Sequence, residues 1–430
     1  MKKFLFLFFI LLPMFSFAKE TDVYIGLSTK YNPADLPKIG LAENSPSDFT
    51  PEEEKTYSNL FADVLRSDLY RSRYFNIEDA APAQISALGP QLANLQKRNV
   101  LYYVFFDFSA TNTQDIWIIK AFMYDTFSKK ALLAKSFKVP TKSIRKSAHL
   151  FADQIIKLLT GKRGLSSTKI AFANDSTGRK EIYIVDYDGY NLAKLTNDKS
   201  ISLLPRWAEN GTKLYYTTYR NRNPQIYVLD LKEGASSPVM QDKGLNLIGG
   251  VSADSKKLVM TLSRGQNPSI YLKDLASGRT LELTDKYGVD GSPSFSPDGK
   301  FVTFVSNRSG NPQVYVMNLE TKQMRRLTRF NWTDSPQWSP NGDWIAFAGR
   351  QSANHPIDIF LVDITGSQVR QLTADSGSNE DPWWSPDGRF IAFTTNRAGK
   401  RQIYVMDADG SAQHLIANIK GNSFTPSWSD

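Results

Sequence analysis

The sequence predicts an α+β N-terminal domain followed by an all-β six-bladed β-propeller. Two observations lead to this fold class: a motif centred on a Pro-x-aromatic tripeptide recurs every 43–46 residues in the C-terminal part, and the residues before it show helical and strand-like spacing without a repeat. A period of about 40–45 residues suits a four-stranded propeller blade and is too long for a leucine-rich repeat. We therefore expect a signal peptide at residues 1–18, the α+β domain at 19–162 and the propeller at 163–430.

The repeat is clearest at residues 293–299, which read Pro-Ser-Phe-Ser-Pro-Asp-Gly. Its aromatic position recurs at intervals of 44, 44, 43, 46 and 44 residues and is held by Trp207, Val251, Phe295, Trp338, Trp384 and Trp428. Proline presets φ for a turn, Asp or Asn bonds to its own backbone, and glycine accepts the positive φ that closes the hairpin. We therefore interpret the Pro-Asp-Gly segments as turns and the large aromatics as packing between blades.

The number of blades follows from the two ends of the repeat region. The first unit, at Lys169, lacks a preceding Pro-x-aromatic strand, while residues 426–430 form such a strand with no unit after it. Pairing the two segments would complete one blade and remove the free sheet edges between the first and last blades. This predicts six blades closed by the C-terminal strand, rather than five or seven.

The N-terminal domain is predicted from helix signals and apolar runs. Residues 50–53, Thr-Pro-Glu-Glu, read as an N-cap, a proline at the first helical position and a capping-box glutamate, and helical spacing continues to Leu69. Strand-like runs follow at 101–108, 116–124 and 132–139. A second long helix has an apolar face over residues 144–159 and should end at Gly161. Strands flanked by helices indicate a small α+β domain.

The first residues and the composition restrict the compartment. Met1-Lys2-Lys3, an apolar stretch at 4–17 and Ser16-Phe17-Ala18 predict a secretory signal peptide cleaved after Ala18. The chain has no cysteine, so we expect neither a lipid anchor nor disulfides. The formal net charge of +9, or +7 without Lys2 and Lys3, comes from scattered Lys and Arg. Together with export this argues against nucleic acid and favours an anionic protein or envelope surface as partner.

Three stretches of the sequence resemble the TolB family. They are Phe61 to Ser72, Ala148 to Asp153 with its continuation through Leu159 to Gly164 and Ile170-Ala171-Phe172, and Asp186 to Asn191. The resemblance covers essentially all of the chain after the signal peptide. It implies an exported, periplasmic binding protein of the Tol-Pal system, expected to be a monomer that does not insert into the membrane.

The resemblance also implies the partners. A Pal-like peptidoglycan-associated lipoprotein would bind at one mouth of the propeller, and a TolA-like protein would bind the N-terminus through Glu20, Asp22 and Tyr24. Such a protein would support outer-membrane integrity and envelope constriction during cell division.

Signals for catalysis are missing from the sequence. It contains no G-x-S-x-G nucleophile elbow and no H-E-x-x-H metal motif, and its three histidines, His149, His355 and His414, lie far apart. We therefore expect no catalytic residue, no metal and no cofactor. Because propellers of this repeat type also occur beside hydrolase domains and in some lyases, the alternative is an exported hydrolase or lyase acting on peptide or polysaccharide.

Partner-binding residues are predicted in the loops that enter the innermost strands. These residues are Leu245, Asn246, Ile248, Asp290, Gly291, Trp332, Asp334, Glu380 and Asp381. Apolar side chains in otherwise polar loops suggest anchors for a protein partner, with carboxylates beside them. The loops between second and third strands carry Arg220, Arg264, Arg308, Arg350 and Arg397. We interpret these repeating arginines as ion pairs between blades, with partner binding as the alternative.

Overall fold

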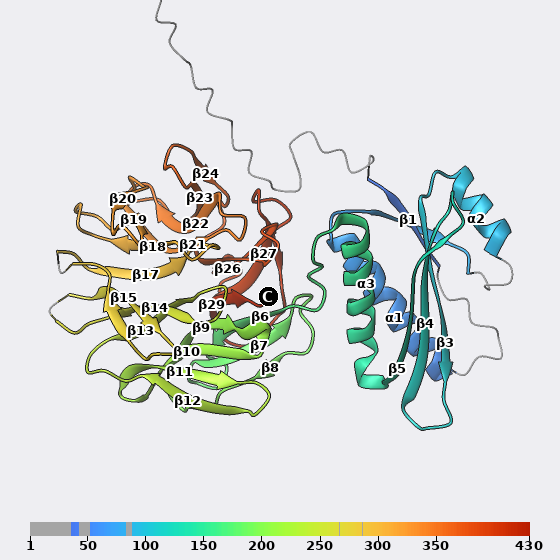
Figure 1. The fold of residues 1–430 in the computed structure, drawn as a ribbon, viewed down its shortest axis with the longest axis horizontal. Helices are drawn as coiled ribbons and strands as arrows, with labels where there is room; N and C mark the ends of the chain where they lie inside the picture. Colours follow the sequence, from blue (N-terminus) through green and yellow to red (C-terminus); the bar gives the residue numbers. More distant parts are fainter. Residues whose placement is uncertain (1–35, 43–51, 83–87, 266, 286) are drawn as a thin grey trace, which may run out of the picture.

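The computed structural model describes residues 36–42, 52–82, 88–265, 267–285 and 287–430, which form two units that lie side by side (Figure 1). The predicted signal peptide at 1–18 and the predicted contact residues Glu20, Asp22 and Tyr24 lie outside the described residues, as do Thr50 and Pro51. Within the described ranges, every helix is too short or too polar to span a bilayer.

The first unit is a five-stranded sheet with helices on both faces. The strands are β1 (Lys38–Ala42), β2 (Asn76–Ala80), β3 (Tyr102–Ala110), β4 (Ile116–Asp125) and β5 (Ala131–Pro140), and the helices are α1 (Glu52–Arg71), α2 (Leu88–Lys97) and α3 (Ile144–Thr160), which follows a 3₁₀ turn at Thr141–Ser143. The sheet order is β2-β1-β3-β4-β5; β1 is parallel to both its neighbours and β3, β4 and β5 are antiparallel. Helices α1 and α3 cover one face and α2 covers the other.

Helix α3 shows how the sequence directs this packing. Its apolar residues recur at helical spacing, so that Ile144, Ala148, Phe151 and Ile155 are all buried against the sheet and α1. The helix ends at Gly161, whose φ of 71° is the left-handed conformation that glycine adopts without a Cβ penalty. Both features match the prediction from the sequence.

Two strands of this sheet, β1 and β2, were not predicted from the sequence. Each has only five residues, and four of the five in β1 are buried because neighbouring strands and helices enclose it. A strand this short and this buried shows no period-two alternation, so periodicity does not detect it.

The second unit consists of six four-stranded antiparallel sheets. Blade 1 is β9 (Ser202–Ala208), β10 (Lys213–Asn221), β11 (Asn223–Asp230) and β12 (Ala235–Met240), with a 3₁₀ turn at Glu209–Gly211. Blade 2 is β13 (Asn246–Val251), β14 (Lys257–Leu262), β15 (Ser269–Asp274) and β16 (Thr280–Glu282). Blade 3 is β17 (Asp290–Phe295), β18 (Phe301–Ser306), β19 (Gln313–Asn318) and β20 (Met324–Arg326). Blade 4 is β21 (Trp332–Trp338), β22 (Trp344–Arg350), β23 (Asp358–Asp363) and β24 (Val369–Gln371), and blade 5 is β25 (Asn379–Trp384), β26 (Phe390–Thr395), β27 (Gln402–Asp407) and β28 (His414–Leu415).

Blade 6 joins the two ends of the propeller. Its innermost strand is β29 (Ser423–Trp428), followed outward by β6 (Lys169–Asn174), β7 (Glu181–Asp186) and β8 (Ala193–Lys194). In the pairing of β29 with β6, Trp428 lies opposite Ile170 and Ser423 lies opposite Asn174. The last strand of the chain therefore completes the blade that the first propeller strands begin. An α+β unit followed by six blades confirms the predicted fold class.

The innermost strands share an irregularity that shapes the centre of the propeller. Each of the six has a register shift against its neighbour in the same blade. In five of them a residue other than glycine has a φ of 49° to 56° near the shift: Leu204, Ser292, Ser335, Asp381 and Thr425. Such conformations persist only where surrounding contacts stabilise them. The repeated bulge therefore shapes the inner surface of the propeller, which we call the channel.

Candidate functional site

The predicted binding loops lie together on one face of the propeller. Strand direction alternates within each blade, so the loops that enter the innermost strands and the loops that join second to third strands open on the same side. We call this face the mouth. The N-terminal domain contacts turns at the opposite ends of the strands, at Arg389 between β25 and β26 and at Asp188 between β7 and β8. The domain interface therefore lies on the face away from the mouth.

The predicted mouth residues differ in how far they reach the surface. Leu245, Gly291, Trp332, Asp334, Glu380 and Asp381 are partly exposed, whereas Asn246, Ile248 and Asp290 are buried. The Asn246 side-chain amide donates to the carbonyls of Pro224 and Asp242 at 3.0 and 2.8 Å, and Ile248 packs in the core between blades 1 and 2. The three buried residues therefore shape the loops, and in this conformation the partly exposed residues form the accessible surface.

Trp332 and Gly291 illustrate the accessible part. Trp332 packs against the core between blades 4 and 5 and remains partly exposed. Beside Gly291 there is open space, because a Cβ added there would meet no atom within 4 Å. A partner side chain could therefore approach the backbone of β17.

Four of the five repeating arginines, Arg220, Arg264, Arg308 and Arg397, bind the loop that enters the innermost strand of their own blade, rather than pairing neighbouring blades as the sequence suggested. Arg220 donates to Asp198 at 2.6 Å and Arg308 donates to Asp290 at 3.0 Å; each acidic residue lies at the start of the same blade. Each guanidinium also lies over the tyrosine of the third strand, 4.2 Å from the Tyr227 ring centre in the first case and 5.6 Å from that of Tyr315 in the second. The motif thus fixes the shape of the mouth loops.

The channel carboxylates belong to a chain of hydrogen bonds that runs from blade to blade. Ser292 Oγ donates to Asp334 Oδ1 at 2.7 Å, and Ser335 Oγ donates to Asp381 Oδ1 at 3.1 Å. The Thr425 amide donates to Asp381 Oδ2 at 3.3 Å, and the Leu204 amide donates to Thr425 Oγ1 at 3.3 Å. These bonds link the innermost strands of blades 3, 4, 5, 6 and 1 through the five residues that have positive φ.

Asp334 and Asp381 are partly exposed as whole residues, but their carboxyl groups are buried and therefore reluctant to ionise. Burial raises the pKa of Asp334, and burial together with the charges of Glu380 and Asp334 raises the pKa of Asp381 to about 6. Glu380 is partly exposed, and it pairs with Arg401 at 2.8 Å. The centre of the mouth is therefore acidic, with part of its charge still available to a partner.

Arg206 is a functional candidate that the sequence analysis missed. It is buried in the channel, where Nε donates to the Gly249 carbonyl at 2.6 Å and the guanidinium lies 4.5 Å from the centre of the Trp383 ring. Burial lowers its pKa to about 10, although the nearby charge of Asp381 favours the cation. The sequence did contain a signal for Arg206. In each repeat one residue stands directly before the aromatic position, after proline or glycine, and this residue is charged in blade 1 alone.

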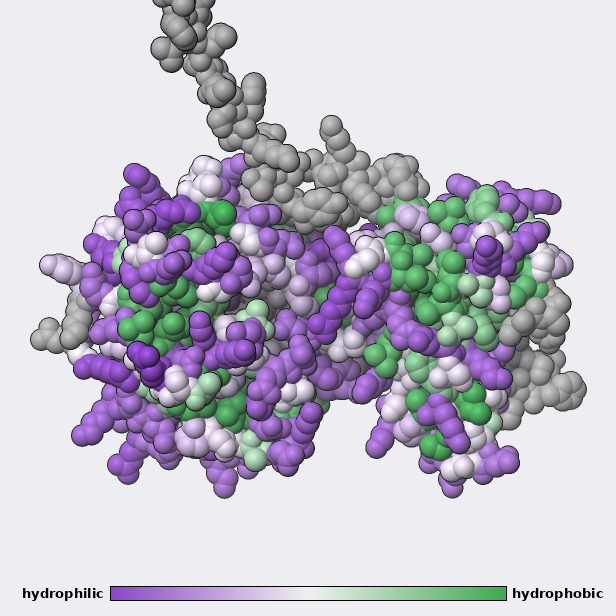
Figure 2. Space-filling model, viewed as in Figure 1, coloured by the Kyte–Doolittle hydropathy of each residue, from purple (hydrophilic) through white to green (hydrophobic). Residues whose placement is uncertain are grey.

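Exposed apolar side chains at the mouth were also missed. Tyr287 is 87% exposed and Val289 47% exposed in the loop that enters β17, and Ile201 is 40% exposed before β9. On the face shown in Figure 2, hydrophilic surface predominates and apolar residues form separate patches on both units. The blade repeat does not specify such residues, because the loops before the innermost strands vary in sequence. They add apolar contact area to Leu245 and Trp332.

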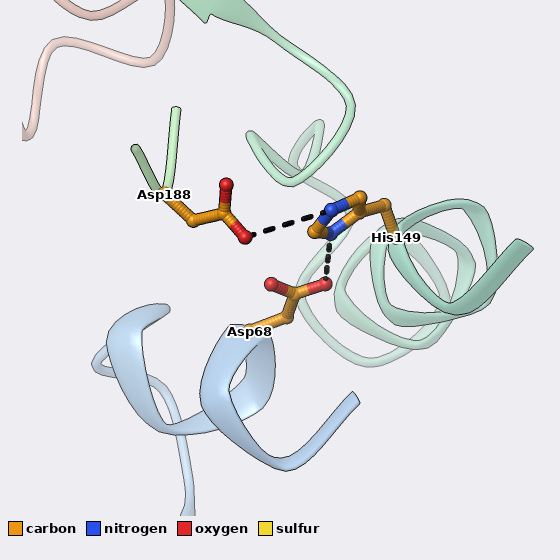
Figure 3. Close-up of side chains that lie close together, drawn as sticks. All are labelled: Asp68, His149 and Asp188. Atoms are coloured by element: carbon orange, nitrogen blue, oxygen red, sulfur yellow. Dashed lines mark hydrogen bonds and ion pairs between the residues drawn. The ribbon is translucent and has the colours of Figure 1, made fainter. Parts of the chain in front are cut away.

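One cluster offers three potential metal ligands among the described residues: Asp68 on α1, His149 on α3 and Asp188 in the turn between β7 and β8 (Figure 3). Asp68 Oδ2 lies 2.7 Å from Nδ1 of the imidazole, and Asp188 Oδ2 lies 3.7 Å from Nε2. Because the carboxylates contact different ring nitrogens, one ion cannot bind both of them together with the ring. Arg145 already forms an ion pair with Asp188. The geometry therefore fits an ion-pair network between the domains better than a metal centre.

Comparison with known proteins points to one family. Residues 156–430 match the family model described as PD40, TolB beta propeller domain. The chain is 37% identical over 179 residues to the Tol-Pal system protein TolB of Geobacter sulfurreducens, covering 41% of each chain. It is 41% identical over 108 residues to the Tol-Pal system protein TolB of Rickettsia prowazekii, covering 24% of each chain. The matched part thus spans less than half the length of these relatives. The fold is similar to the crystal structure of TolB from Acinetobacter baumannii, with a TM-score of 0.77, 27% identity, and coverage of 92% of this chain and 96% of that one.

Proposed function

Because the chain belongs to the TolB family, we propose that it is a periplasmic component of a Tol-Pal system that binds other proteins and does not catalyse a reaction. Both units of the chain support this, since the similarity to the Acinetobacter protein extends over the N-terminal unit as well as the propeller. In this role the protein would contribute to outer-membrane integrity and to constriction of the envelope during division.

The proposed site for a Pal-like lipoprotein is the mouth. The observation that carries this proposal is that the partly or fully exposed Leu245, Tyr287 and Trp332 lie in or next to loops on the same face as the carboxyl groups of Asp334, Glu380 and Asp381. Apolar anchors that surround or flank desolvated polar groups are typical of binding hot spots. The buried Asn246, Ile248 and Asp290 would contribute by holding the loops in position.

The proposed contact for a TolA-like protein is the N-terminal segment with Glu20, Asp22 and Tyr24. This segment lies outside the described residues, so the proposal is based on the family resemblance. Binding by the N-terminus and by the mouth would let one chain contact two partners at once.

The alternative of a hydrolase or lyase finds little support in the geometry. Ser352 Oγ lies 2.8 Å from His355 Nδ1, which is the spacing of a nucleophile and its base. The pair lies in an exposed loop between β22 and β23, however, and no carboxylate among the described residues hydrogen-bonds to this histidine. A local turn contact explains the pair.

Calorimetry with the soluble domain of a Pal-like lipoprotein would test the mouth. We expect Trp332→Ala to weaken binding by about 2 kcal/mol and Tyr287→Ala to weaken it by about 1 kcal/mol, because each removes exposed apolar contact area at the mouth. Lys300→Ala is the matched control, since Lys300 is exposed in a Pro-Asp-Gly turn on the opposite face. Wild-type affinity in the Trp332→Ala, Tyr287→Ala double variant would exclude the mouth as the site.

A further inference from the structure

A buried polar cluster joins the two domains and is not used by the proposed binding site. Asp68 from α1 and Arg145 and His149 from α3 meet Tyr187 and Asp188 of the propeller. Tyr187 Oη donates to Asp68 Oδ1 at 2.5 Å, and Arg145 pairs with Asp188 while its guanidinium lies 3.7 Å from the centre of the Tyr190 ring. The contacts between the domains at this point are therefore almost entirely polar.

Within this cluster, two buried nitrogens have no hydrogen-bond partner, Nε of Arg145 and Nε2 of His149, and the second faces a carboxylate. His149 is only 3% exposed, and its Nε2 atom makes no hydrogen bond although Asp188 Oδ2 lies 3.7 Å away. The other ring nitrogen, Nδ1, is 2.7 Å from Asp68 Oδ2. A neutral imidazole that donates from Nδ1 turns a lone pair toward the Asp188 carboxylate, which is unfavourable.

One added proton turns this unfavourable contact between His149 and Asp188 into a favourable one. Asp68, Asp188 and Arg145 carry a net charge of −1 when His149 is neutral, and the added proton brings the buried group to neutrality. Whether the proton resides on Asp68 or on the imidazole, Nε2 then carries a hydrogen that points at Asp188 across the domain interface. The hydrogen bond and the charge attraction both act between the two domains.

We propose that uptake of one proton by the Asp68–His149 pair tightens the docking of the N-terminal domain onto the propeller, so that the relative position of the domains responds to pH. Domains of one chain move relative to each other by default unless their interface is large and hydrophobic, so a polar contact of this kind can shift the balance. This inference does not depend on the proposed function.

The direction of the pKa shifts agrees with the proposal. Burial lowers the pKa of His149, but the hydrogen bond and charge of Asp68 and the charge of Asp188 outweigh burial and the opposing charge of Arg145, so its pKa is raised. Burial also raises the pKa of Asp68. Burial and the charge of Asp68 raise the pKa of Tyr187, with a small opposing effect of Arg71, so this hydroxyl remains a donor. Because the pKa of His149 is raised in the docked form, the bound proton stabilises docking fully at pH values below the ordinary histidine pKa. This stabilisation is lost as the pH rises through the raised pKa.

Distance measurement between labels on the two domains tests the proposal. The chain has no cysteine, so Lys97→Cys on α2 and Gln323→Cys next to β20, both exposed, can be spin-labelled uniquely. Pulsed dipolar spectroscopy should show one narrow distance at about pH 5.5 and a broader distribution at about pH 8.5. Histidine resonances measured on the same protein report when His149 takes up its proton, because only three histidines are present.

Variants separate this cluster from its neighbours. His149→Gln should abolish the pH dependence of the distance distribution, and Asp188→Asn should reduce it while the imidazole still titrates. His414→Gln is the control, because His414 lies near the second interdomain ion pair of Arg73 with Asp407, and it should respond like wild type. The proposal is overturned if the wild-type distribution is unchanged while His149 titrates, or if His149→Gln keeps the wild-type response.

Discussion

At the scale of single residues, the channel depends on a few side chains whose surroundings differ from those of their repeat counterparts. Asp381 accepts hydrogen bonds from Ser335 and from the Thr425 amide, and it lies close enough to Arg206 for their charges to interact. The blade repeat predicted where such residues lie along the chain. It could not predict their burial or their charge balance, because the positive-φ bulge that turns Asp381 inward depends on contacts with neighbouring blades.

The pKa of Asp381, raised to about 6, leads to a pH prediction. The folded protein holds this proton more tightly than the unfolded chain, whose aspartates titrate near 3.9, so the contribution to stability falls as pH rises from about 4 to above 6. Asp381→Asn removes this pH dependence. Relative to its effect at pH 4, the substitution should raise the free energy of unfolding at pH 8 by about 2 to 3 kcal/mol. Urea unfolding followed by tryptophan fluorescence measures this, because seven of the eight tryptophans are in the propeller.

Asp375→Asn is the matched control for that experiment. Asp375 is exposed in the loop that enters β25, and its substitution should leave the pH dependence of unfolding unchanged. A constant difference in stability between wild type and Asp381→Asn across this pH range would contradict the account of the channel.

At the scale of elements, the six-blade architecture and the helices α1 and α3 could be read from the sequence, because turn chemistry and apolar spacing are local signals. The short strands β1 and β2 could not, since five residues give too little pattern and the burial of β1 comes from tertiary contacts. The candidate binding site was predicted only in part, because local signals do not report tertiary contacts. Loop positions followed from the repeat, whereas the inward placement of Asn246 and Ile248 and the exposure of Tyr287 depend on how adjacent blades pack.

The closing strand β29 gives the prediction at this scale. Trp428 Nε1 donates to Thr168 Oγ1 at 2.8 Å, just before β6 of the same blade, and Trp207 Nε1 of blade 1 donates to the Ser427 carbonyl at 2.9 Å, so residues 426–430 bind their own blade and blade 1. Their deletion exposes the edge of β6 and removes a buried tryptophan, which should cost about 3 to 5 kcal/mol and lower the thermal midpoint. Removal of Asp430 alone, which is exposed, serves as the control. An unchanged midpoint after the longer deletion would mean that β29 does not hold the ring closed.

At the scale of the whole molecule, the two faces of the propeller have different roles. One face carries the N-terminal domain and the Asp68–His149 cluster, and the other carries the mouth with its acidic centre and exposed apolar residues. This separation leaves the mouth accessible while the domains stay docked. It also means that a partner bound at the mouth would contact the N-terminal unit only if it reached around the propeller.

Hydrogen exchange of the chain with and without the soluble domain of a Pal-like lipoprotein tests this division most directly. If the mouth is the binding site, the amides of residues 241–246, 287–290 and 329–334 should exchange more slowly in the complex, because those segments enter β13, β17 and β21. The amides of α1, α3 and the Pro-Asp-Gly turns should be unaffected. Protection confined to the N-terminal unit or to the Pro-Asp-Gly face, with none in the mouth loops, would contradict the account.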